Sequence, residues 1–180
     1  IFYLSNNIKL IYNDVRRFGF IKIAKSTGIH KNEHLRFLGP EPLSKNFNYN
    51  YFKKNIIKKN KNLKNLLMDQ KFVSGLGNIY VNEILHLCKL KPTKKTSNLS
   101  IDNIVSIVRF TKEVLAISIK KGGSSIKNFN DVRGNAGVFQ QSFRVYGREG
   151  KKCRKNLCKG LIKKTIISNR STFFCQNCQK

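Results

Sequence analysis

The chain has 180 residues, with 36 Lys and Arg against 9 Asp and Glu, and a formal net charge of +27 at pH 7. Its length and its hydrophobic content of 40% allow one or two small domains with real cores, whereas the absence of any run of about eighteen apolar residues excludes a membrane-spanning helix. Abundant Lys, Asn and Ile are typical of an AT-rich genome, but such bias does not explain the scarcity of acids. A surface this positive predicts a polyanionic partner, with nucleic acid first and an anionic membrane surface second.

The amino-terminal part predicts strands and turns. Alternating apolar and polar residues at 1–4 and 8–12 flank Ser5-Asn6-Asn7, which indicates a hairpin, and Phe20–Ile23 predicts a further strand. The sequence begins at Ile1, without an initiator Met, in what reads as the middle of a strand. We therefore expect a fragment cut upstream, and no targeting segment is visible.

The turn at 13–19 carries two arginines and a large aromatic ring. Taken by themselves, these residues favour a solvated loop whose Phe18 folds into the core. The alternative is a wedge, in which Arg16 and Phe18 enter duplex DNA and fill the space that a displaced base leaves.

A stiff, proline-bounded segment at Leu38–Leu43 is typical of the start of an interdomain linker. From Tyr49 onward, apolar residues recur at helical spacing opposite a face of lysines. The lysines continue through Lys61 and Lys64. Such a face is either simply solvated or contacts phosphates, and the residues leave both readings open.

Two helices are expected next, at Leu63–Met68 and at 79–87, joined by a glycine-containing double turn. Asn78 is expected to cap the second helix. The exposed backbone amides at the start of that helix would cradle a phosphate, although most glycine turns have no such role. His86 and Cys88 on this helix are interpreted as ordinary core or surface residues rather than metal ligands.

A long amphipathic helix is predicted from Ser100, its cap, to Gly122-Gly123. Its predicted buried stripe consists of Ile101, Ile104, Val105, Val108, Leu115 and Ile119. The polar segment 124–141 is too long for a simple connection, which indicates a functional or mobile loop. Phe143–Tyr146 predicts a short strand.

Cys153 and Cys158 form one cysteine pair, and Cys175 and Cys178 form a second. Two short knuckles at this separation suit a tetrahedral zinc site, because each lends two thiolates. There are two alternatives: disulfides, or four unrelated buried thiols. Disulfides are disfavoured by the abundance of lysine and by the absence of a secretory signal. The stretch between the pairs predicts two strands joined at Ser168-Asn169. We therefore predict a zinc ribbon that binds one Zn²⁺ per chain.

Together these segments resemble the formamidopyrimidine-DNA glycosylase family, the bacterial base-excision enzymes for oxidised purines. The matching segments are Asp14–Gly19, Leu38–Leu43, Leu67–Gln70, Gly75–Tyr80, Gly122-Gly123, Val145–Gly150 and Arg170–Cys175. Each is weak alone, but their order along the chain is specific. The resemblance covers the carboxy-terminal two-thirds of such an enzyme.

The resemblance implies a multi-domain α+β fold. Residues 1–43 would end a β-sandwich catalytic domain, and 44–142 would form a helix–two-turn–helix DNA-binding domain whose lesion lid spans about 124–141. Residues 143–180 would form a zinc-finger β-hairpin. The implied partner is damaged double-stranded DNA, with no membrane. The implied enzyme is a monomeric, cytoplasmic, nucleoid-associated bacterial protein.

The resemblance also implies roles for single residues. Arg16 and Phe18 would enter the duplex after the damaged nucleotide flips out, with Arg16 facing the orphaned base. Lys59 and Lys64 would contact DNA ahead of the double turn. Asn78 would grip a phosphate beside the lesion.

The implied activity is that of a glycosylase and AP lyase, which excises 8-oxoguanine and formamidopyrimidines and nicks the strand by β,δ-elimination. Arg170 would clamp the phosphates that flank the extruded nucleotide and would assist the second elimination. The nucleophile of the family is an amino-terminal proline followed by glutamate, which this chain lacks in that context, so by itself it is expected to bind DNA without cutting. A non-catalytic zinc-dependent DNA-binding module and an endonuclease VIII-type enzyme for oxidised pyrimidines remain alternatives.

Two further departures from the family pattern bear on local shape. The first knuckle has four residues between its cysteines where two are usual, so Lys155 and Asn156 resemble an insertion. Val15 replaces a proline, which leaves its turn less rigid.

Overall fold

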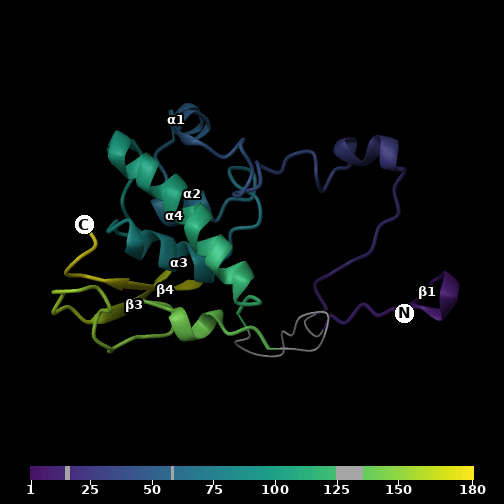
Figure 1. The fold of residues 1–180 in the computed structure, drawn as a ribbon. Helices are drawn as coiled ribbons and strands as arrows, with labels where there is room; N and C mark the ends of the chain where they lie inside the picture. The colour runs from purple at the N-terminus through teal and green to yellow at the C-terminus, as the bar shows by residue number, and fades with distance from the viewer. Residues whose placement is uncertain (15–16, 58, 125–135) are drawn as a thin grey trace. The chain divides into compact units, whose positions relative to one another are not determined.

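A computed structural model of the chain describes residues 1–14, 17–57, 59–124 and 136–180. They form two compact units, Ile1–Arg36 and Phe37–Lys180 (Figure 1). The described part combines α-helices with β-hairpins, in agreement with the α+β expectation. None of its helices is both long enough and apolar enough to cross a membrane.

The first unit contains a small hairpin. Strand β1 (Phe2–Tyr3) pairs antiparallel with β2 (Lys9–Leu10), and a 3₁₀ turn at Ser5–Asn7 joins them. Asn6 and Asn7 have φ of 65° and 57°, a left-handed region that Asn occupies more readily than most residues. The predicted hairpin is therefore confirmed.

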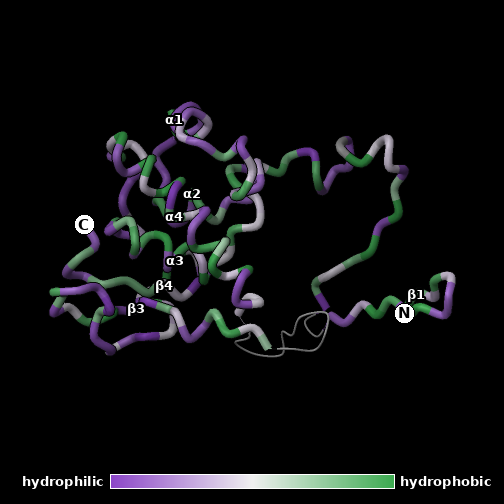
Figure 2. The backbone as a smooth tube through the Cα atoms, viewed as in Figure 1, coloured by the Kyte–Doolittle hydropathy of each residue, from purple (hydrophilic) through white to green (hydrophobic). Residues whose placement is uncertain are grey.

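The predicted strand at Phe20–Ile23 is wrong. Among the described residues of the first unit, β1 and β2 are the only paired strands, and a 3₁₀ helix at Ser26–Lys31 follows. Figure 2 shows that several hydrophobic stretches run through this unit. Ile23 is nevertheless 95% exposed. Alternating apolar residues form a strand only where a neighbouring strand takes their backbone groups, and the described residues supply none here.

The second unit contains the described α-helices. They are α1 (Tyr49–Ile56), α2 (Leu63–Leu67), α3 (Asn78–Leu87) and α4 (Ile101–Lys120). Each lies where the apolar periodicity predicts a helix. The predicted cap of α4 is confirmed, because the Ser100 hydroxyl accepts the Asn103 N–H at 3.2 Å in a capping box.

The predicted buried stripe of α4 is only partly correct. Ile104 is buried, whereas Ile101, Val105 and Ile119 are 61%, 48% and 66% exposed. The buried face of α4, which packs against α1 and α3, is rotated around the helix axis relative to the predicted stripe. It consists of Ile104, Ile107, Thr111, Val114 and Ser118.

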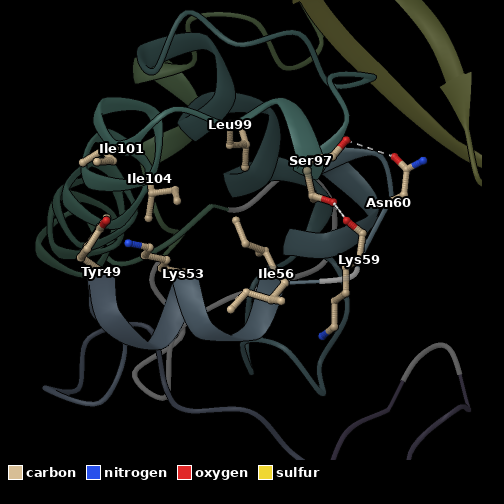
Figure 3. A pocket seen from close by; sticks show the side chains of 11 residues that line it. Tyr49, Lys53, Ile56, Lys59, Asn60, Ser97, Leu99, Ile101 and Ile104 are labelled. Atoms are coloured by element: carbon tan, nitrogen blue, oxygen red, sulfur yellow. Dashed lines mark hydrogen bonds between the residues drawn. The ribbon is translucent and has the colours of Figure 1, made fainter.

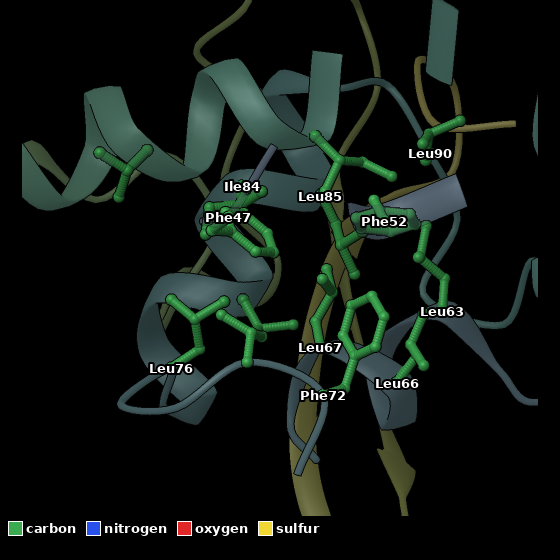
Figure 4. Close-up of a cluster of buried hydrophobic side chains, with 14 of the residues drawn as sticks. Phe47, Phe52, Leu63, Leu66, Leu67, Phe72, Leu76, Ile84, Leu85 and Leu90 are labelled. Atoms are coloured by element: carbon green, nitrogen blue, oxygen red, sulfur yellow. The ribbon is translucent and has the colours of Figure 1, made fainter. Parts of the chain in front are cut away.

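Side chains from α1, α2 and α3 meet in the core of the second unit (Figure 4). Phe52 packs edge-on against Phe72, with ring centroids 5.0 Å apart. Tyr51 donates its hydroxyl hydrogen to the Phe72 carbonyl at 2.8 Å. Aromatic pairs of this kind contribute about 0.5–1.5 kcal/mol beyond the area that they bury, so they fix α1 against the turn that precedes α3.

That turn is held by one amide side chain. Gln70 accepts the Gly75 N–H at 2.6 Å and donates to the Leu76 carbonyl at 3.1 Å. Gly75 has φ of +78°, which a side chain would strain. The Gly39 N–H donates to the Gln70 carbonyl at 2.8 Å, so the predicted linker segment packs against this turn.

The predicted strand at Phe143–Tyr146 is also wrong. The backbone N–H groups of Arg144, Val145 and Tyr146 donate to the carboxylate of Glu83 on α3, at 2.8, 3.0 and 2.8 Å. One buried carboxylate thus takes the donors that a strand would direct to a neighbouring strand. This segment is consequently fixed to α3.

The second hairpin consists of β3 (Ile162–Ile167) and β4 (Arg170–Cys175). Its register runs from Ile162 opposite Cys175 to Ile167 opposite Arg170. Ser168 and Asn169 have φ of 49° and 58°, as the tight two-residue hairpin turn requires. The predicted ribbon is confirmed, and Arg170 directly follows its turn.

Candidate nucleic-acid interface and metal centre

Four cysteine sulfurs converge at the end of the hairpin opposite its turn. The Sγ atoms of Cys153, Cys158, Cys175 and Cys178 all lie within 4.8 Å of one another, with 3.8 Å between Cys153 and Cys178 and 3.6 Å between Cys158 and Cys175. A tetrahedral Zn²⁺ with bonds of about 2.3 Å places its sulfurs about 3.8 Å apart. A disulfide needs about 2.05 Å. The donor set therefore fits zinc and excludes the disulfide alternative.

The longer first knuckle does not disturb this arrangement. The Cys153 N–H donates to the Gly160 carbonyl at 2.8 Å, and the Cys158 N–H donates to the Lys155 carbonyl at 3.1 Å. Leu157 has φ of 63° and is fully exposed. Asn156 is exposed as well, so the longer knuckle turns toward solvent at these two residues and leaves both sulfurs in the cluster.

The thiols of Cys153, Cys158 and Cys178 differ in acidity. The Asn177 side chain donates to Cys158 Sγ at 3.4 Å and, with the Gly160 N–H, lowers the pKa of Cys158 to about 6. Burial raises the pKa of Cys153 and of Cys178 above the ordinary thiol value. A bound cation would deprotonate all four, since thiolates are the form that ligates zinc.

Gln179 fastens the second knuckle to the segment that follows α3. Its buried side chain accepts the Cys175 N–H at 2.8 Å and donates to the Leu90 carbonyl at 2.7 Å. The neighbouring Lys180 N–H donates to the Lys89 carbonyl at 2.9 Å. Sequence reasoning missed this residue, because a glutamine after a cysteine has no distinctive pattern.

Two asparagines of α3 bind β4. Asn78 donates its side-chain N–H to the Ser171 carbonyl at 2.9 Å, and Asn82 accepts the Phe173 N–H at 2.7 Å. The predicted cap is wrong, since Gly77 is the N-cap and Asn78 is the first helical residue. Asn82 was missed, although a polar residue four positions after Asn78 on a buried helix is a usable signal.

His86 lies four residues after Asn82 on α3, and its side chain reaches the metal centre. Its Nε2 lies 3.2 Å from Cys153 Sγ, and its side chain is buried. Burial, followed by the charges of Arg144 and Lys155, lowers the pKa of His86 to about 4, so the imidazole is neutral at pH 7. The four-sulfur group includes neither His86 nor Cys88.

Lys64 of α2 lies under the hairpin near its turn. Its Nζ donates to Thr172 Oγ1 at 2.6 Å and to the Ser171 carbonyl at 3.4 Å, and the residue is 1% exposed. Burial first, and the nearby guanidinium of Arg170 second, lower the pKa of Lys64 to about 8. Its amine therefore supports the hairpin, and its predicted DNA contact stays a prediction.

The other predicted DNA contacts occupy different environments. Arg170 is exposed beside the hairpin turn, and Phe18 in the first unit is 80% exposed. Lys59 holds its Nζ 5.4 Å from the centre of the Phe72 ring. Arg16 and most of the predicted lid, 125–135, lie outside the described residues.

Lys59 also lines a hollow of about 460 Å³ between α1 and the segment that leads into α4 (Figure 3). Tyr49, Lys53 and Ile104 line it as well. Thr96 donates its hydroxyl hydrogen to the Lys59 carbonyl at 2.5 Å, which fixes the backbone at one edge. The hollow thus combines apolar walls with two lysines.

Known domain families match both parts of this site. The formamidopyrimidine-DNA glycosylase H2TH domain matches residues 38–130, and the zinc finger found in FPG and IleRS matches residues 150–180. The second match, together with the four converging sulfurs, confirms the predicted zinc site, whose four sulfurs can bind one Zn²⁺.

Individual proteins are similar over nearly the whole chain. The formamidopyrimidine-DNA glycosylase of Roseobacter denitrificans is 40% identical over 180 residues, which are 100% of this chain and 64% of that protein. Lactococcus lactis Fpg in complex with DNA containing an abasic site has a TM-score of 0.84 at 36% identity, covering 93% of this chain and 60% of that one. MutM in complex with DNA containing carbocyclic 8-oxo-G has a TM-score of 0.83 at 35% identity, with the same two coverages of 93% and 60%.

The chain therefore spans just under two-thirds of the length of the Roseobacter relative that it matches. The H2TH domain match alone extends over more than half of the chain, and the zinc-finger match adds its carboxy-terminal part. On these grounds, the chain belongs to the formamidopyrimidine-DNA glycosylase family.

Proposed function

We propose that this chain is the DNA-binding part of a base-excision repair glycosylase and AP lyase that removes oxidised purines from duplex DNA and nicks the strand by β,δ-elimination. Family membership supports the proposal, as do the abasic-site and 8-oxo-G DNA bound by two structural neighbours. Because the chain spans 64% of its Roseobacter relative, the activity is proposed for the complete protein.

One observation carries the proposal: the start of α3 and the Arg170 turn lie side by side. The hydrogen bond from Asn78 to the Ser171 carbonyl joins the first residue of α3 to the residue after Arg170. The guanidinium of Arg170 is close enough to lower the pKa of Lys64. Two cations and the positive end of a helix dipole thus gather in one place, which suits a phosphate of the DNA backbone.

The remaining roles are proposed by family likeness. Arg16 and Phe18 enter the duplex beside the flipped nucleotide, and Lys59 adds a DNA contact. Arg170 clamps flanking phosphates and assists the second elimination. Residues 124–141 act as the lid over the everted base.

The domain division is proposed on the same basis. Residues 1–43 end a β-sandwich, 44–142 form the helix–two-turn–helix domain, and 143–180 form the zinc finger. The protein acts as a monomer in the bacterial cytoplasm, associated with the nucleoid.

These residues by themselves are proposed to bind DNA without cutting it. The family's reaction needs a secondary amine as the nucleophile. The chain has 3 prolines, and each occupies an internal position, where its nitrogen is an amide. Binding is therefore the property to test first.

The test is a fluorescence-anisotropy titration of the zinc-loaded chain with four labelled duplexes, which carry 8-oxoguanine, an abasic analogue, thymine glycol or no lesion. We expect the purine lesion and the abasic analogue to bind more tightly than the undamaged duplex, with nicking measured in parallel. Equal affinity for all four duplexes would overturn damage recognition. Preference for thymine glycol would indicate an endonuclease VIII-type enzyme instead.

A further inference from the structure

Three polar residues follow one another at intervals of four on α3: Asn78, Asn82 and His86, here called the polar face of α3. Four helical residues advance about 6.0 Å, and two strand residues advance about 6.6 Å. Asn78 binds the Ser171 carbonyl and Asn82 binds the Phe173 N–H, so helix and strand advance together. The third residue, His86, therefore arrives where β4 ends at the metal centre.

The contact of His86 has a defined polarity. Its Nε2 lies 3.2 Å from Cys153 Sγ, and a metal-bound thiolate can only accept a hydrogen bond. The Nε2 atom must then carry the proton. Nδ1 is buried and has no hydrogen-bond partner among the described residues, so a proton there would be a buried donor without an acceptor. Both atoms favour the same tautomer.

His86 is close to the metal ligands without being one of them. The four sulfurs lie within 4.8 Å of one another, and the group that they form does not include the imidazole. Cys178 Sγ lies 3.9 Å from Nε2, further than Cys153 Sγ. Four thiolates around one Zn²⁺ keep a net negative charge, which N–H donors outside the ligand set disperse.

We propose that His86 is a positioning residue, which donates its Nε2 hydrogen to the zinc-bound thiolate of Cys153 and thereby holds the zinc ribbon on α3. The proposal concerns the metal centre and does not rest on the proposed function. It adds a third attachment to the two that the asparagines make. The attachment also links metal binding to the position of the hairpin that carries Arg170.

The test compares three variants of the full chain. His86→Phe keeps a ring of similar size and removes both nitrogens. His86→Gln keeps an N–H donor near the position of Nε2. Cys88→Ala is the matched control. Cys88 is half-buried at the end of the same helix, and its sulfur does not belong to the four-sulfur group.

Zinc affinity is measured by competition with a chromophoric chelator, and the thiolate-to-cobalt charge-transfer band is recorded after substitution with Co²⁺. We expect His86→Phe to weaken zinc binding about 10- to 100-fold, as the loss of a hydrogen bond to a metal ligand does elsewhere. The band should also shift. His86→Gln should recover most of both properties, and Cys88→Ala should change neither.

Unchanged affinity and spectrum in His86→Phe would overturn the proposal. A loss of affinity without a spectral shift would assign His86 to packing alone and would overturn it as well. So would a loss that His86→Gln fails to recover. None of these measurements involves DNA, so their failure is distinct from failure of the proposed function.

Discussion

Lys64 Nζ lies 2.6 Å from Thr172 Oγ1, although 108 residues separate the two in sequence. This hydrogen bond joins α2 to the zinc-bearing hairpin two residues after Arg170. Its donor is an amine that is 1% exposed, and burial lowers the pKa of this amine to about 8. The relationship makes the site sensitive to pH.

DNA affinity should fall as the pH rises above about 8. Burial first and Arg170 second bring the pKa of Lys64 to about 8, below its ordinary 10.5. A nearby phosphate favours the charged amine, so binding above pH 8 takes up a proton and loses at most about tenfold in affinity per pH unit. Anisotropy titrations from pH 6.5 to pH 9.5 measure this decline. An equal decline in Lys64→Met would assign the effect to another group.

Folding should depend on pH with the opposite sign. Between pH 8 and 10.5 the unfolded chain holds the Lys64 proton more tightly than the folded chain does. Lys64 therefore contributes a free energy of unfolding that rises across this window. Urea titrations of the native chain and of Lys64→Met at both ends of the window isolate the contribution as a difference. Parallel pH dependence in the two proteins would contradict it.

Arg170→Ala should weaken binding to a lesion duplex and reduce its salt dependence. Each phosphate neutralised on duplex DNA contributes about 0.9 to the slope of log affinity against log salt. We expect the slope to fall by about that amount. Lys163→Ala, an exposed cation near the opposite end of the same hairpin, is the control. An unchanged slope in the Arg170 variant would mean that the hairpin turn does not touch the backbone.

Cys175→Ser should abolish stoichiometric zinc binding and unfold the ribbon. Cys175 is fully buried, and its backbone N–H binds Gln179, so the loss of metal also releases the attachment to Leu90. Metal analysis of the purified chain and far-UV circular dichroism report the two effects. Cys88→Ser should keep one zinc per chain. Full zinc content in the Cys175 variant would refute the four-thiolate site.

Glu83→Gln should lower the free energy of unfolding by about 1–3 kcal/mol, the cost of unsatisfied buried polar groups. Burial raises the pKa of this carboxyl, although three backbone N–H donors favour its charged form. An amide offers one acceptor oxygen and adds two buried donors. Urea unfolding of the zinc-loaded chain measures the loss, with exposed Glu113→Gln as the control. Equal stability of the two variants would contradict a structural role for Glu83.

Local chemistry made part of this structure predictable. The cysteine spacing indicated the zinc ribbon, because ligand geometry limits how knuckles can be arranged. Ser100 indicated the start of α4, because its cap involves only Asn103, three residues further along the chain. The ribbon turn at Ser168-Asn169 is equally local. Each of these predictions depends on residues close together in sequence.

The missed features depend on distant residues. The segment at 143–146 alternates like a strand, but Glu83, about 60 positions earlier, takes its donors. Asn78 was predicted to cap α3, but its side chain donates a hydrogen bond to the Ser171 carbonyl instead. His86 faces Cys153 across 67 positions. A short stretch of the sequence cannot contain both partners of any such pair, so local patterns do not predict these contacts.

The polar face of α3 also restricts how this hairpin can vary. Four residues of α3 advance about 6.0 Å along the helix axis, whereas two residues of β4 advance about 6.6 Å along the strand. The two elements therefore drift apart in register by about 0.6 Å at each such step. Two steps tolerate that drift, but many would not. A single-residue insertion in β4 would turn every following side chain to the opposite face. Insertions and deletions in this strand should therefore be tolerated only in pairs.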